Sequence, residues 1–262
     1  MSVASEIKID IAEQFQHLPH APIVEAVIEV RTRAEAPLEE ASMRSQLESK
    51  LPDYRFLDSQ RAFQHELKVE PGQKPKQNLR DLGWRRMRFQ SADQLHVVRF
   101  NRDGFVFSRL RPYEKWEQLR GEGMRLWQSY SELIRPTEVQ RLGLRFINRI
   151  ELPPQELRFE DYIQPAPQPP NTLDLPFRAF LHHDTLAVPG HPYAINVIRT
   201  IQHPQNPGTQ WIAVILDIDV FTLRAFEYRQ DVLEQRLAEM RWLKNKVFFG
   251  SITQKALEKF QQ

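Results

Sequence analysis

Two aspartates in one short stretch are the residues most suited to chemistry. Asp217 and Asp219 stand two residues apart in LDIDVF, a segment whose composition predicts a β-strand. Because side chains alternate across a strand, both carboxylates point to the same face. Paired carboxylates can hold divalent cations against phosphate oxygens. One hypothesis is therefore a metal-dependent phosphoryl or nucleotidyl enzyme built on Asp217 and Asp219. Pairing of both acids with arginines is the competing interpretation.

Other reactive centres find little support in the sequence. Cysteine is absent, which excludes disulfides, thiolate metal sites and cysteine nucleophiles. His182 and His183 are adjacent, so on a strand they point to opposite faces and cannot share one metal ion. No G-x-S-x-G segment or glycine-rich phosphate loop is present. We expect no catalytic residue and no cofactor.

Positive charge gathers in the middle of the chain. Residues 1–60 carry a net charge of −5, residues 61–125 carry +7 and residues 126–262 carry zero. Single-stranded nucleic acids are bound by arginines interleaved with aromatic faces, and alternation predicts Trp84, Arg86 and Arg88 on one face of a strand. A second hypothesis is therefore nucleic-acid binding, with internal Arg–Glu pairing as its alternative. The candidate residues are Trp84, Arg85, Arg86, Arg88, Arg102 and Arg109.

The elements that must position these residues alternate between strands and helices. β-branched runs and turn residues predict strands over 23–31 and 62–69, a three-strand meander over 83–110, and strands over 141–152, 177–188, 193–202 and 210–224. Helical spacing of apolar residues predicts helices over 37–51, 112–134 and 228–249. The expected fold class is α+β, with antiparallel sheets packed by long helices in two similar β-rich halves that each end in a helix.

Proline marks the one candidate boundary between these halves. The stretch 153–176 is the densest in proline and also contains Phe159, Tyr162 and Ile163, which favours an ordered crossover over a linker. The expected division is an N-terminal half at 1–152, the crossover at 153–176 and a C-terminal half at 177–262.

The strand 141–152 separates two kinds of residue. Arg145 belongs to an arginine stripe that can pair with Glu25 and Glu29 if the two strands are neighbours. Asn148 falls on the opposite, apolar face, where it needs hydrogen-bond partners if it is buried. We expect structural or interface roles for Arg145 and Asn148, and for three residues near the C-terminus: Phe248, Phe249 and the N-cap candidate Thr253.

Composition also bears on location. With 41% hydrophobic residues the chain can bury a core, but no run approaches 18 apolar residues. The first residues lack a basic segment followed by an apolar one. Together with the absence of cysteine, this predicts a cytoplasmic protein without membrane contact.

Four segments taken together resemble one protein family. They are APIVEAVIEVR, YEKWEQL, RLGLRFINRIELP and VFFGSITQKALEKF. In this order they are similar to a sporadically distributed family of uncharacterised prokaryotic proteins of about this length. This chain departs from it at Arg241, where members often carry histidine. The family has no settled activity, and its patchy distribution implies mobile loci such as phage-defence or toxin–antitoxin islands.

The first functional hypothesis follows from these observations together. It is a non-enzymatic binding protein, an adaptor or sensor, that acts through protein–protein contacts within such a mobile defence locus. The expected partner is a protein encoded by a neighbouring gene, and self-association as a homo-oligomer is the other expected contact.

Overall fold

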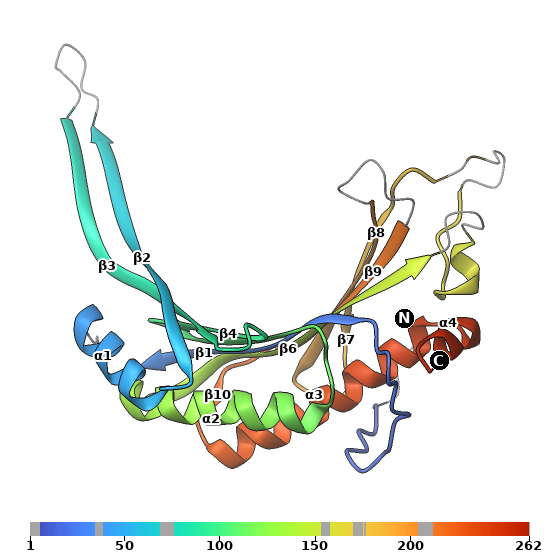
Figure 1. Ribbon diagram of the computed structural model, residues 1–262, viewed down its shortest axis with the longest axis horizontal. Coiled ribbons are helices and arrows are strands. Elements are labelled where there is room, and N and C mark those ends of the chain that lie inside the picture. The colour runs from blue at the N-terminus through green and yellow to red at the C-terminus, as the bar shows by residue number, and fades with distance from the viewer. Residues whose placement is uncertain are drawn as a thin grey trace.

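One antiparallel sheet organises the molecule. The computed structural model describes residues 6–34, 39–68, 76–152, 158–169, 175, 177–203 and 212–261. Its strands run in the order β2-β3-β4-β5-β1-β6-β9-β8-β7, and β10 pairs with the beginning of β6 (Figure 1). The strands are β1 (Ile23–Ala34), β2 (Tyr54–Lys68), β3 (Lys76–Ser91), β4 (His96–Asn101), β5 (Gly104–Leu110), β6 (Pro136–Leu152), β7 (Leu181–Ala187), β8 (Tyr193–Gln202), β9 (Ile212–Thr222) and β10 (Phe226–Glu227).

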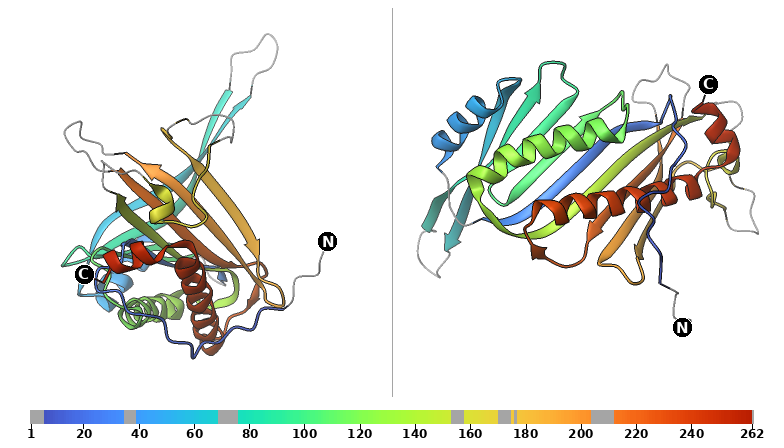
Figure 2. Two further views of the ribbon diagram at one scale, coloured as in Figure 1. Left: turned by 90° about the vertical axis from the view of Figure 1, so that its right-hand side faces the viewer. Right: turned by 90° about the horizontal axis from the view of Figure 1, so that it is seen from below.

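The described helices are few. They are α1 (Glu40–Lys50), α2 (Trp116–Ile134), α3 (Gln230–Ser251) and α4 (Gln254–Lys259), with a 3₁₀ turn at Phe159–Asp161. Seen from below, α1, α2 and α3 lie across the same face of the sheet (Figure 2). None of the helices in the described ranges is long and apolar enough to span a membrane.

The expected α+β fold, with antiparallel sheets packed by long helices in two halves, is wrong. Strands make up 46% of the structure and helices 27%, so the fold is β-rich. The physical reason lies in β6, which pairs with β1 along one edge and with β9 along the other. An unpaired β6 edge would leave a row of N–H and C=O groups without partners, and β9 satisfies them. The strands of both predicted halves therefore form one sheet.

The predicted domain boundaries are a separate matter. The division at 1–152, 153–176 and 177–262 stays a prediction, and residues 153–157, 170–174 and 176 of the crossover lie outside the described part. The three residues that favoured an ordered crossover, Phe159, Tyr162 and Ile163, are buried. Ile163 also forms a β-bridge with Ile252 just after α3.

The core lies between the sheet and its helices. In β1, Ala26, Ile28 and Val30 are fully buried on the helix-covered face, as the period of two in a strand requires. Gly123 lets α2 approach closely, because a Cβ there would stand 2.9 Å from the Ile28 Cδ1 atom. Burying each large aliphatic side chain contributes about 1.5–3 kcal/mol. This face therefore provides most of the stability and leaves the opposite face open.

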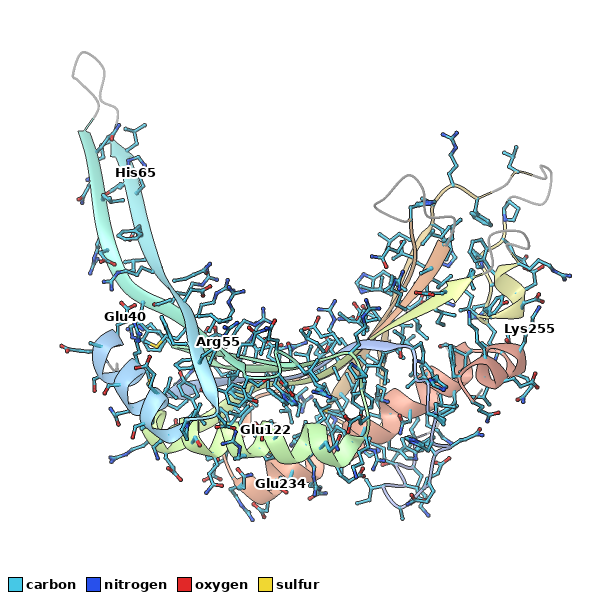
Figure 3. All side chains as sticks on the ribbon, viewed as in Figure 1. Glu40, Arg55, His65, Glu122, Glu234 and Lys255 are labelled. Carbon is cyan, nitrogen blue, oxygen red and sulfur yellow. The ribbon has the colours of Figure 1, made fainter. Side chains whose placement is uncertain are left out.

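The open face is bounded by two projecting ends. The outer parts of β2 and β3, residues 61–68 and 76–83, extend beyond the helices as a hairpin that we call the arm; His65 marks its outer half (Figure 3). Strands β7, β8 and β9 rise at the other end (Figure 1). The sheet curves between them, so its helix-free side is concave.

The N-terminal segment, residues 6–22, packs against α3. Glu13 accepts hydrogen bonds from the Trp242 Nε1 atom at 2.7 Å and from the Lys246 Nζ atom at 2.8 Å. The Phe15 ring stacks on Phe249 with 5.7 Å between ring centres. This segment therefore lies against the outer side of α3.

Candidate functional site

The two strand aspartates are held by arginines on the open face. Arg145 makes a two-fold contact with Asp217, at 2.8 Å from Nε to Oδ1 and 2.5 Å from Nη2 to Oδ2. Arg141 donates to the Asp219 Oδ2 atom at 2.8 Å and also binds Glu29. Within the described residues no group of three His, Asp or Glu side chains is placed to hold a metal ion. The arrangement supports internal charge pairing.

Burial and pairing shift the pKa values of these charged groups. Desolvation raises the pKa of Asp219, and Arg141 and Arg145 oppose that shift. The hydrogen bond with Asp217 raises the pKa of the Arg145 guanidinium. Strands β1 and β6 are neighbours, so Glu29 does pair with an arginine of β6, whereas Glu25 lies opposite Ile147. The arginine stripe is thus largely neutralised by carboxylates of the same sheet.

The residues of the nucleic-acid hypothesis do not gather on one face. Arg85 is an extra residue in β3, because Arg86 lies opposite Gln60 while Trp84 lies opposite Arg61. This bulge turns Trp84 into the core, where it is only 5% exposed, and leaves Arg86 on the open face. Simple alternation, which placed Trp84 with Arg86, therefore failed here.

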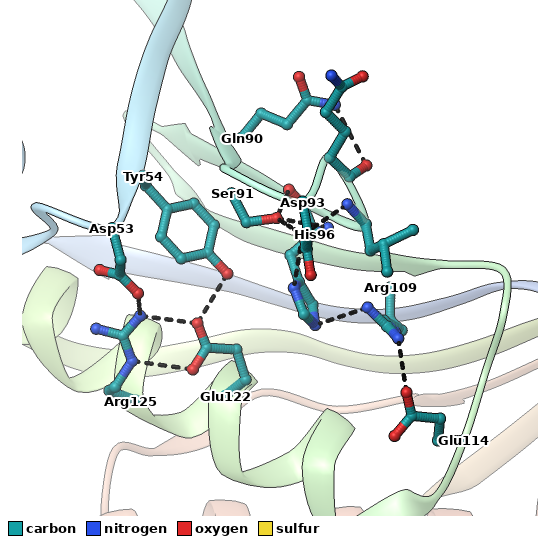
Figure 4. A network of polar contacts seen from close by, with 12 residues as sticks. Asp53, Tyr54, Gln90, Ser91, Asp93, His96, Arg109, Glu114, Glu122 and Arg125 are labelled. Atoms are coloured by element: carbon teal, nitrogen blue, oxygen red, sulfur yellow. Dashed lines mark hydrogen bonds and ion pairs between the residues drawn. The ribbon is translucent and has the colours of Figure 1, made fainter.

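Two other arginines of the nucleic-acid hypothesis, Arg102 and Arg109, make hydrogen bonds within the protein. Arg102, in the turn between β4 and β5, donates to the Leu82 carbonyl oxygen at 2.9 Å. Arg109 is 7% exposed and lies in a polar network, 3.3 Å from the His96 Nε2 atom and 3.5 Å from Glu114 (Figure 4). Burial lowers the pKa of His96, and Arg109 adds to that shift. Arg109 is therefore held inside the protein.

Three arginines remain together on the open face. Arg88 lies directly opposite Arg99 in the pairing of β3 with β4, and Arg86 is two residues from Arg88. Arg88 pairs with Asp58, but neither Arg86 nor Arg99 has an ion pair among the described residues. The Nε atoms of all three are buried without a hydrogen-bond partner there. Like charges facing each other destabilise a sheet, so this cluster favours an anion from outside.

Two of these arginines, Arg86 and Arg99, border a hollow of about 600 Å³ on the open face. We call it the arginine hollow. Acidic residues also reach it, so its lining carries both signs of charge. The charged residues around it are Glu25, Glu29, Arg31, Arg86, Arg99, Arg141, Arg145 and Asp219.

The residues with expected structural roles separate between the two faces. Asn148 is 1% exposed on the helix-covered face and donates to the Leu216 carbonyl oxygen at 2.9 Å. Asn148, Phe248 and Phe249 line one cavity on this face, next to α3 and the beginning of α2. Arg145 is on the opposite face. Thr253 caps α4 by accepting a hydrogen bond from the Ala256 backbone N–H at 3.2 Å.

Sequence reasoning missed Lys244 and Tyr113, which line that cavity with Asn148. A signal for Lys244 was available. Leu233, Leu237 and Met240 form the apolar stripe of α3, and the next position of the stripe is Lys244. A lysine in a buried stripe indicates a functional or paired group.

The chain matches no protein-family model, no curated protein and no solved structure. The resemblance to a prokaryotic family stays a prediction.

Proposed function

We propose that this protein is a non-enzymatic binding protein that holds an extended, acidic segment of a protein partner against the open face of its sheet. The observation that carries the proposal is the arginine hollow. It places Arg86 and Arg99, without carboxylate partners among the described residues, on a concave surface between two projecting ends.

Carboxylates are the chemistry that would complete this surface. A guanidinium presents a planar fork of donors that matches a carboxylate, and such charge-assisted hydrogen bonds are stronger than neutral ones. Arg86 and Arg99 line the hollow without an ion pair among the described residues, so an incoming carboxylate would balance charges that the described part of the chain leaves unpaired. An acidic side chain near Arg86 and Arg99 would also relieve the repulsion between Arg88 and Arg99.

A protein partner fits this surface better than a nucleic acid. Glu25, Glu29 and Asp219 border the same hollow and would repel a phosphate backbone, which is charged at every nucleotide, whereas a peptide can place its acidic side chains at Arg86 and Arg99 alone. Binding to nucleic acid draws on uncompensated positive charge along the backbone path, whereas protein interfaces match patches of both signs. In keeping with the predicted defence locus, we propose that the partner is encoded by a neighbouring gene.

A site-specific photo-cross-linker tests this proposal in cells of the source organism. Benzoylphenylalanine at Val106, in the hollow, should capture one defined protein, whereas the same group at Gln118, exposed on α2, should not. The adduct should disappear when Arg86→Glu and Arg99→Glu are combined and should persist in Arg120→Glu, a charge reversal on α2. An adduct with nucleic acid would favour the second hypothesis instead. No adduct, or one that survives the double reversal, would exclude the hollow as the binding surface.

Self-association has a separate candidate surface on the arm. The register of β2 with β3 places Phe63, Leu67 and Leu79 on one side of the arm, and each is more than half exposed. Exposed apolar side chains gathered in this way favour association. We propose that a second copy covers them. Light scattering should show a mass that rises with concentration, and Leu79→Glu should keep the protein monomeric. A monomer at all concentrations would refute this contact.

A further inference from the structure

A second hollow lies on the helix-covered side, away from the arginine hollow. It has a volume of about 450 Å³ and is enclosed by α3, the beginning of α2 and residues 14–18 of the N-terminal segment. Volumes of about 300–1,000 Å³ are typical of small-molecule sites. Aromatic side chains form much of its wall: Phe15, Tyr113, Trp116, Phe146, Phe248 and Phe249.

Lys244 reaches this cavity from α3. The residue is only 8% exposed, and its Nζ atom stands 4.0 Å from the centre of the Phe146 ring. Among the described residues, no carboxylate pairs with it and no acceptor takes a hydrogen bond from it. Buried lysines are rare unless they are paired. Among the described residues, the ammonium group is therefore stabilised by a cation–π contact with Phe146 alone.

Other polar groups in the cavity also lack partners. Neither the Asn245 amide nor the Tyr113 hydroxyl has a hydrogen-bond partner within the described ranges, although Asn245 is 8% exposed. The Asn148 amide donates to backbone carbonyls and leaves its oxygen unbonded there. None of these atoms is among the fully buried polar atoms without a partner, so they are open to a ligand that enters the cavity.

The beginning of α2 adds a positive field. Trp116 and Glu117, the first two residues of this 19-residue helix, line the cavity, and no side chain caps its N-terminus. The N-terminus of a helix attracts anions through its free N–H groups and its dipole. Together with Lys244 this indicates a negatively charged ligand.

We propose that the cavity binds a small carboxylic acid with a flat apolar body, whose carboxylate is held by Lys244 and whose body packs against the aromatic wall. Of the cations that line the cavity, Lys244 is the buried one without a carboxylate partner among the described residues, whereas Arg241 lies 3.8 Å from Glu117, so the site matches one negative charge. The predominance of aromatic side chains matches an apolar body rather than a sugar or a free phosphate. The Asn245 amide and the Tyr113 hydroxyl provide hydrogen bonds to the same carboxylate.

Protonation gives the proposal a signature besides affinity. Burial lowers the pKa of Lys244 to about 7, and Arg241 on the same helix adds to that shift. The other charged or titratable groups around the cavity are His17 from the N-terminal segment and Glu114, Lys115 and Glu117 from the start of α2. Glu117 stands 3.8 Å from Arg241. A bound carboxylate would stabilise the charged amine, so binding above pH 7 should take up a proton.

Titration calorimetry with 2-naphthoate tests the site. The neutral isostere 2-naphthamide should not bind, and Lys244→Met should weaken naphthoate binding about ten- to a hundredfold. Lys50→Met, a surface substitution on α1, should leave it unchanged. In two buffers of different ionisation enthalpy, the wild-type protein should take up close to one proton per ligand at pH 8 and close to none at pH 6.

Several results would overturn the proposed carboxylate site. Equal binding of the acid and the amide would overturn the proposal, as would full affinity in a folded Lys244→Met variant. Should that variant not fold, the absence of proton uptake by the wild-type protein at pH 8 would overturn it. Failure of 2-naphthoate, benzoate and octanoate to bind at millimolar concentration would have the same meaning.

Discussion

Lys244→Met removes a buried amine and keeps an unbranched side chain that can pack in the same place. In the folded protein Lys244 is 8% exposed as a residue, and its amine has no carboxylate partner in the described part of the chain. In the unfolded chain the same amine is hydrated and charged. Folding therefore requires it either to lose its proton or to bury its charge, and both destabilise the native state. We expect the methionine variant to be more stable.

The size of the effect follows from the pKa. It falls from 10.5 to about 7 on folding, and each pH unit of difference corresponds to about 1.4 kcal/mol. Above pH 10.5 the amine is neutral in both states and costs nothing. As the pH falls towards 7, the unfolded chain binds a proton that the folded protein does not, so the destabilisation grows. It reaches about 4 kcal/mol near pH 7 and stays nearly constant below.

Urea unfolding of wild type and variant between pH 6 and pH 10 measures this difference directly. The variant should be more stable by about 4 kcal/mol at pH 7 and by about 2 kcal/mol at pH 9. Groups that titrate in both proteins cancel in the comparison, and Lys50→Met should show no such trend. A difference that does not change with pH, or a variant less stable than wild type, would refute the reasoning.

Two further predictions concern structural pairs. Arg145→Glu places a second carboxylate beside Asp217, whose side chain is 9% exposed; because Arg145 itself is 46% exposed, we expect a loss of about 2 kcal/mol, below the 3–5 kcal/mol of fully buried pairs. An unchanged urea midpoint would contradict it. Thr253→Ala removes the cap of α4 and should cost about 1 kcal/mol, with faster amide hydrogen exchange in α4. Thr253→Ser should retain most of the protection, and equal exchange in all three proteins would argue against the cap.

Local elements of this fold could be predicted from sequence, because their signals are local. The β-branched run after Pro22 and the segment RLGLRFINRIEL both form strands, and apolar spacing located α2 and α3 within a few residues. The union of the strands into one sheet could not be predicted. Alternation in LDIDVF shows that β9 has two distinct faces, but it does not specify which strand edge it joins.

The candidate sites show the same limit. Arg–acid pairing around Asp217 and Asp219 was one of two interpretations, since spacing alone cannot distinguish a metal from an arginine. The bulge at Arg85 has no clear signal in the sequence, and it reversed the predicted side of Trp84. Lys244 was detectable as a charge in an apolar stripe, but the cavity around it depends on the N-terminal segment and the start of α2, which meet only in the folded protein.

The central position of β1 has a consequence for synthesis. This strand leaves the ribosome well before β6, because its partner residues in β6 lie more than a hundred residues further along the chain. Such distant pairing gives the fold a high contact order, which slows folding. Until β6 is synthesised, the backbone N–H and C=O groups along one edge of β1 have no strand partner. Exposed strand edges of this kind promote aggregation. Efficient production of this protein should therefore depend on chaperones that shield the growing chain until β6 emerges.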